Sequence, residues 1–123
     1  MDRLFIEASD DTPEVNFNKE ENIFEISGKI LPENEAEFFE PIYQWFENYI
    51  KNPNNTTNFK LKIEYFNSAS HKAINELLEI LCKIKSENVT VEWHYLKDDD
   101  DMLESGHDYE ELTGLNFVFK PYS

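Results

Sequence analysis

The hydrophobic period of the chain changes within the segment from Phe59 to Ile84, and this change constrains the fold more than any other feature. Residues 59–66 alternate between apolar and polar side chains, which is typical of a β-strand. After a break at residues 67–70, the apolar residues follow helical spacing: Ala73, Ile74, Leu77, Leu78, Leu81 and Ile84. A strand followed directly by an amphipathic helix indicates an α/β domain.

The rest of the chain continues this alternation. We expect further strands at residues 15–17, 23–27, 89–95 and 115–119, with an edge strand or ordered arm at residues 4–8. Helices are expected from residues 32–35 to Ile50, with a kink at Pro41, and from Asp98 to Leu112, with Gly106 weakening the middle. This order predicts a single α/β domain over residues 1–123, with parallel crossovers in a mixed sheet flanked by helices.

Composition narrows the classes of partner. The 123 residues suit one domain, and 26 acidic against 11 basic residues give a net charge of −15. Such a surface repels nucleic-acid backbones and anionic lipids, and it favours a partner with a basic face, although acidity can also serve solubility alone. The lone Cys82 allows no internal disulfide, and we expect it to be a buried thiol. With no signal peptide or membrane span in the sequence, we expect a cytoplasmic protein.

The hydroxyl cluster between the strand and the helix has two interpretations. The first N–H groups of a helix lack internal partners and lie at the positive end of its dipole, so a serine there can cap the helix. The same position can also hold a phosphate. On this basis Ser68 is either a cap or a phosphorylation switch, Ser70 is the expected N-cap, and Asn67 is expected to shape the turn.

The junction Asn67-Ser68-Ala69-Ser70 and the order of the segments around it resemble the SiaC family of bacterial regulatory phosphoproteins, which are similar to STAS-type anti-sigma-factor antagonists. The resemblance covers nearly the whole chain and depends on the order and spacing of several weak motifs. These are Thr12-Pro13 with Val15 and Phe17; Phe24 to Gly28; Pro32-Glu33-Asn34; Phe38 to Pro41 with Trp45 and Tyr49; Val91 to Tyr95; and Asp101 to Gly106 with Asp108-Tyr109.

The resemblance implies a regulatory protein and not an enzyme, with a STAS-like fold. In the family a threonine usually takes the phosphate, and here Ser68 stands in its place. The resemblance further implies a serine/threonine kinase and a PP2C-type phosphatase that act on Ser68. The unphosphorylated form would bind and activate a diguanylate cyclase, and so control cyclic di-GMP output and biofilm behaviour. An anti-sigma-factor antagonist with the same switch is the alternative that the sequence leaves open.

The remaining candidates for chemistry are weaker. The run Asp98-Asp99-Asp100-Asp101 lacks the pattern of a calcium loop, so we interpret it as a solvated helix start or an acidic edge that docks a partner. His71, His94 and His107 have no metal-ligand spacing, and nothing marks a catalytic triad. We therefore expect no metal, cofactor or catalytic residue and take His71 to be a surface residue beside the cluster. A small hydrolase or metal enzyme that uses Ser68, His71 or the acidic run is the second alternative.

Overall fold

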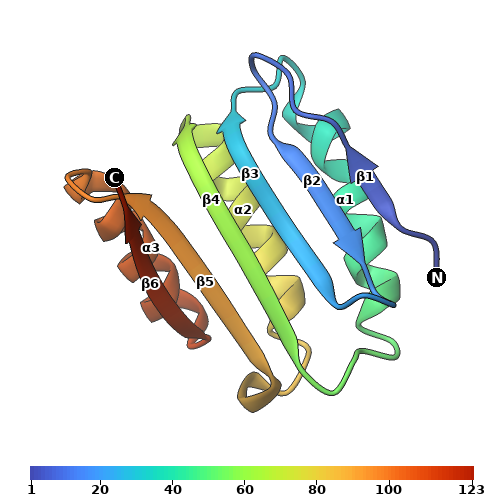
Figure 1. Ribbon diagram of the computed structural model, residues 1–123. Coiled ribbons are helices and arrows are strands. Elements are labelled where there is room, and N and C mark those ends of the chain that lie inside the picture. Colours follow the sequence, from blue (N-terminus) through green and yellow to red (C-terminus); the bar gives the residue numbers. More distant parts are fainter.

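The computed structural model describes all of residues 1–123 and consists of one six-stranded sheet with three α-helices (Figure 1). The strands are β1 (Leu4–Ile6), β2 (Glu14–Asn18), β3 (Ile23–Ile30), β4 (Thr57–Phe66), β5 (Val89–Leu96) and β6 (Asn116–Tyr122). The helices are α1 (Glu35–Tyr49), α2 (Ser68–Leu81) and α3 (Asp100–Thr113), and a 3-10 turn, η1, spans Ser86–Asn88. The predicted order of elements is confirmed, including the N-terminal strand.

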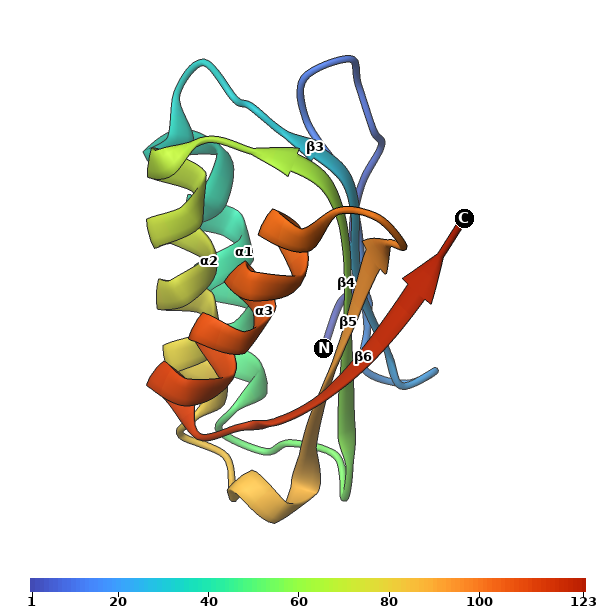
Figure 2. The same ribbon diagram turned by 90° about the vertical axis from the view of Figure 1, so that its left-hand side faces the viewer.

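The strands lie in the sheet in the same order as in the chain. β1, β2 and β3 pair antiparallel, whereas β3, β4, β5 and β6 pair parallel, so the sheet is mixed as predicted. Each parallel connection passes through one helix, and all three helices lie on the same face of the sheet (Figure 2). The other face, called the open face below, has no helix over it.

The core fills the space between the helices and the covered face of the sheet. It contains 27 buried apolar side chains, among them an aromatic cluster in which Phe17 packs against Phe46 and Trp45 at ring-centroid distances of 4.7 and 5.2 Å. α1 continues through Pro41, which is exposed and removes one helical hydrogen bond. No helix of the structure is long and apolar enough to cross a membrane.

α3 continues through Gly106, and this glycine lets the helix approach the sheet. A Cβ atom at this position would lie 2.7 Å from the indole ring of Trp93 and 2.8 Å from the ring of Phe119. The Trp93 ring is fully buried, and its Nε1 donates a hydrogen bond to the carbonyl oxygen of Met102 at 3.0 Å. Close packing of α3 on β5 and β6 therefore requires a residue without a side chain.

The carboxyl ends of β3, β4 and β5 meet the amino ends of the helices at one edge of the molecule (Figure 2). Near this edge the pairing of β3 with β4 shifts register between Gly28 and Lys29, so that β4 contains one extra residue. A bulge of this kind redirects side chains, and it leaves both Glu64 and Tyr65 exposed just before the start of α2. The strand–helix junction singled out from the sequence lies at this edge.

Candidate phosphorylation site

Ser68 is the first residue of α2 and is exposed. Asn67, directly before it, has extended backbone angles, and its Oδ1 accepts a hydrogen bond from the backbone N–H of Ser70 at 2.9 Å. Asn67 is therefore the N-cap, and the prediction that Ser70 caps the helix is wrong. The reason is that β4 continues to Phe66 and α2 begins only two residues later, which leaves Asn67 in the cap position.

Ser70 is fully buried and has a different structural role. Its Oγ donates a hydrogen bond to the backbone carbonyl oxygen of Ile30 at 2.9 Å, which joins the start of α2 to the end of β3. The helical spacing did contain this signal, because Ser70 lies three and four residues before the buried Ala73 and Ile74. An enzyme that modifies this segment can reach the hydroxyl of Ser68 but not that of Ser70.

The first turn of α2 is well suited to an added negative charge. The backbone N–H groups of Ser68 and Ala69 have no helical partner, because they belong to the first turn. α1 and α3 each have acidic residues in their first turn, but α2 has none. Lys72, one helical turn after Ser68, is exposed. The local environment of the Ser68 hydroxyl is therefore electrostatically favourable to an anion.

His71 is not a surface residue as expected, because its ring lies half-buried between Phe66 and Tyr109. The Tyr109 hydroxyl donates to the His71 carbonyl oxygen at 2.8 Å and lies 2.7 Å from Nδ1, so it accepts a hydrogen bond from the Nδ1–H group. Nε2 lies 3.3 Å from the Ser105 hydroxyl. Burial lowers the pKa of His71, while the nearby Asp108 carboxylate opposes the shift. These contacts hold the first turn of α2 to α3.

Ser105 and Tyr109 were missed by the sequence reasoning, because neither stands near His71 in the chain. Both residues lie on α3, whereas His71 lies on α2, and the parallel crossovers place these two helices side by side. Both nitrogens of the imidazole are occupied by hydroxyl groups, and no carboxylate orients the ring. The arrangement is therefore suited to holding two helices together.

The acidic run begins α3 at the same edge as Ser68. Asp99 is the N-cap, and its Oδ1 accepts from the backbone N–H of Met102 at 3.0 Å. Asp100 and Asp101 form the first helical turn, where the dipole favours them, and Asp98 is exposed. The four carboxylates do not converge, and no group of His, Cys, Asp and Glu side chains in the structure could hold a metal ion. The run is a helix start, as one of its two interpretations expected.

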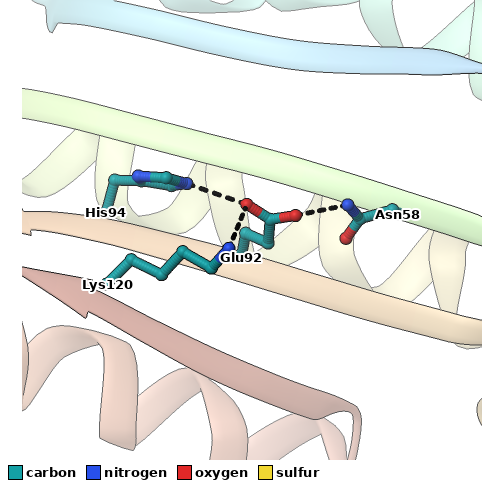
Figure 3. A network of polar contacts seen from close by, with 4 residues as sticks. All are labelled: Asn58, Glu92, His94 and Lys120. Atoms are coloured by element: carbon teal, nitrogen blue, oxygen red, sulfur yellow. Dashed lines mark hydrogen bonds and ion pairs between the residues drawn. The ribbon is translucent and has the colours of Figure 1, made fainter.

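The open face has a polar network that the sequence did not suggest (Figure 3). The carboxylate of Glu92 accepts hydrogen bonds from Asn58 and from His94, the latter at 3.0 Å, and Lys120 lies 3.4 Å away. The hydrogen bonds from Asn58 and His94 lower the pKa of Glu92 to about 2, with a further contribution from Lys120 and against the effect of burial. His94 was predicted only as a residue of an alternating strand, and the network depends on the pairing of three strands.

Cys82 also differs from the prediction, because it is exposed. α2 ends at Leu81, so Cys82 occupies the C-cap position and leaves the apolar stripe of the helix. Its Sγ lies 3.6 Å from the carbonyl oxygen of Thr113.

The family model described as "SiaC family regulatory phosphoprotein" matches residues 6–122, which is almost the whole chain. The chain belongs to the SiaC family. The predicted family and α/β fold are thereby confirmed, and the prediction of a regulatory protein and not an enzyme agrees with this family.

Relatives of the chain share its whole length. An uncharacterised protein of Pseudomonas aeruginosa strain UCBPP-PA14 is 23% identical over 124 residues, which cover 99% of this chain and 98% of that protein. The solved structure of apo-SiaC from P. aeruginosa is 24% identical and superimposes with a TM-score of 0.87 over 98% of this chain and 99% of that chain. SiaC in complex with the diguanylate cyclase SiaD, which it activates, is 22% identical with a TM-score of 0.89 over 97% and 99% of the two chains. At these identities the superpositions show a shared fold.

Proposed function

We propose that this protein is a phosphorylation-controlled switch in which Ser68 is the phosphoacceptor and the unphosphorylated form binds and activates a diguanylate cyclase. The observation that supports the acceptor is the difference between the two serines of the junction. Ser68 is exposed on the first turn of α2, whereas Ser70 is buried and hydrogen-bonded to Ile30. Membership of a family of regulatory phosphoproteins supports the role.

The physical effect of the phosphate would be local. A phosphate adds about −1.5 to −2 charges and three strong hydrogen-bond acceptors. On Ser68 those oxygens would meet the free N–H groups of the first turn, and Lys72 stands one turn away. Because the fold already favours an anion there, phosphorylation would change the docking surface without unfolding α2.

The partners in this proposal come from the family and from the SiaC–SiaD complex of P. aeruginosa. A serine/threonine kinase would phosphorylate Ser68, and a PP2C-type phosphatase would reverse the reaction. The cyclase would be active with the unphosphorylated protein, so that cyclic di-GMP output and biofilm behaviour follow the state of Ser68.

Site mapping tests the acceptor. Incubation with the cognate kinase and ATP, followed by intact-mass and peptide analysis, should place one phosphate on Ser68 and none on Ser68→Ala. Ser86→Ala is a matched control, because Ser86 is also exposed and also begins a helical turn. Full labelling of Ser68→Ala would overturn the assignment.

The effect of the modification is tested separately. Phosphorylated protein should fail to stimulate the cyclase while keeping the circular dichroism spectrum and melting temperature of the unmodified protein. A large fall in melting temperature on phosphorylation would show that the modification acts through unfolding, which would contradict the proposed mechanism.

We also propose that the acidic run docks a basic surface of the partner. Asp98, Asp100 and Asp101 are exposed at the same edge of the molecule as the junction, whereas Asp99 is used as a cap. Their charge should mainly speed association, and exposed charges are screened beyond about 8 Å at physiological salt. Replacing the three exposed acids by asparagine should slow association at low salt; an unchanged rate across a salt series would restrict the run to its role as a helix start.

A further inference from the structure

The charges of this acidic protein are unevenly divided between its two faces. The three helices contain twelve acidic residues and one basic residue, Lys72. On the open face the balance is different. Its basic residues are Arg3, Lys29, Lys60, Lys62 and Lys120. Its acidic residues are Glu14, Glu25, Glu64 and Glu92. The open face therefore lacks the negative charge that dominates the helical face.

Strand register places two of these lysines on either side of a histidine. Lys62 on β4 pairs with His94 on β5, and His94 pairs with Lys120 on β6. Glu92, the acid nearest this row, is already bonded to His94 and lies 3.4 Å from Lys120 (Figure 3). Lys62, His94 and Lys120 are called the basic row. Lys120 has no second carboxylate partner within 4.0 Å and Lys62 has none, so both lysines can attract a carboxylate from another molecule.

Three large side chains, Tyr65, Leu96 and Tyr122, follow the basic row toward the edge that carries Ser68 and are called the apolar row; the Glu64 carboxylate lies near Tyr122. Leu96 and Tyr122 are register partners at the ends of β5 and β6, and Tyr65 pairs with Lys29 after the bulge in β4. Tyr65 is 56% exposed and Leu96 is 48% exposed, so both side chains are available to contact another molecule. The two rows touch, because the Lys62 ammonium lies 4.5 Å from the centre of the Tyr122 ring.

From this pairing of rows we propose that the open face over β4, β5 and β6 docks a segment of the target that presents carboxylates to the basic row and apolar side chains to the apolar row. The proposal rests on the proposed function, since it names the surface and the kind of segment through which the unphosphorylated protein would hold the cyclase. Charge complementarity selects an acidic segment. A basic segment would be repelled by Lys62 and Lys120 on the open face, and it would be attracted to the acidic residues of the helices.

The location of Ser68 explains how phosphorylation would release the docked target segment. Tyr65 stands three residues before Ser68, at the same edge of the sheet. A phosphate there would place about two negative charges beside an apolar contact and close to the carboxylates of the docked segment. Both the desolvation of the phosphate and the like-charge repulsion oppose docking, and neither requires a change in the fold.

The sign of a charge-reversal effect tests the proposal. Binding of the unphosphorylated protein to the full-length cognate cyclase would be measured by calorimetry for the double variant Lys62→Glu, Lys120→Glu. We expect the dissociation constant to rise roughly tenfold or more, which corresponds to about 1.4 kcal/mol. The matched control is Lys51→Glu, Lys83→Glu, which has the same net charge but changes exposed lysines outside the open face, and it should bind within about twofold of wild type. Tighter binding by the first variant, or equal losses in both, would overturn the proposal.

Two further variants guard against loss of folding. Lys62→Gln with Lys120→Gln avoids a repulsive contact with Glu92, and its binding should weaken in the same direction by a smaller factor. Leu96→Ala should weaken binding, whereas Leu112→Ala, which truncates a 73% exposed leucine on α3, should not. Wild-type affinity for both open-face variants, with melting temperatures unchanged, would refute the open face as the docking surface.

Failure of the underlying function gives a different result. If wild-type protein does not stimulate the cyclase, or if phosphorylated and unphosphorylated protein stimulate it equally, the proposed function fails and the docking surface fails with it. If stimulation and its loss on phosphorylation are normal but only substitutions on the helical face reduce affinity, the proposed function stands and the open-face surface alone is wrong.

Discussion

Gly106→Ala is expected to destabilise the protein, although alanine is the better helix former. In an exposed helix this change would stabilise by about 1 kcal/mol. Here the new Cβ would lie 2.7 Å from two atoms of the Trp93 ring, whereas carbon atoms normally approach to about 3.5–4.0 Å. Trp93 is fully buried and bonded to Met102, so the relief must come from a shift of α3 by about 1 Å. We expect a net loss of roughly 1–3 kcal/mol, which is typical of an overpacked core.

Thermal and urea unfolding followed by circular dichroism and Trp fluorescence would measure this loss. The melting temperature should fall by roughly 3–6 °C for each kcal/mol in a chain of this size. Glu104→Ala is the control, because Glu104 is exposed on the same helix, and it should change stability by less than about 0.5 kcal/mol. A Gly106→Ala variant that melts at or above the wild-type temperature would show that α3 does not pack against Trp93 as described.

Three further predictions concern the junction and the open face. Ser70→Ala should lower the free energy of unfolding by about 1–2 kcal/mol, because the buried carbonyl of Ile30 loses its donor, and a neutral result in urea unfolding would contradict that bond. Asn67→Ala should cost about 1 kcal/mol and Asn67→Asp almost nothing, since only alanine removes the cap; equal melting temperatures for the two variants would refute the cap. Glu92 has a folded-state pKa of about 2 against an ordinary 4.5, so its contribution is present above pH 4.5 and is lost as the pH falls toward 2. Unfolding of wild type and Glu92→Gln from pH 2 to 7 should therefore differ least at the acid end, and a constant difference would mean that the network does not form.

The local pattern of the sequence was sufficient for the secondary structure, because strand and helix periods depend on residues close together in the chain. The strand of residues 59–66 and the helix after it were predicted, and Ser68 was placed correctly between them, although β4 begins at Thr57 and α2 ends at Leu81, before Ile84. The identity of the N-cap was predicted wrongly, because Asn67 and Ser70 are both good capping residues and only the end of β4 decides between them.

Contacts between distant segments were decided by the tertiary structure. Nothing near Gly106 in the chain indicates the Trp93 ring that excludes a side chain there, and nothing near His71 indicates Tyr109. The division of charge depends on the same cause. Sequence alone determined that the protein is acidic overall, but the placement of all three crossovers on one face of the sheet put the acidic helices there together. Lys62, His94 and Lys120 became neighbours only through the parallel register of β4, β5 and β6, since strand pairing joins residues that are far apart in the chain.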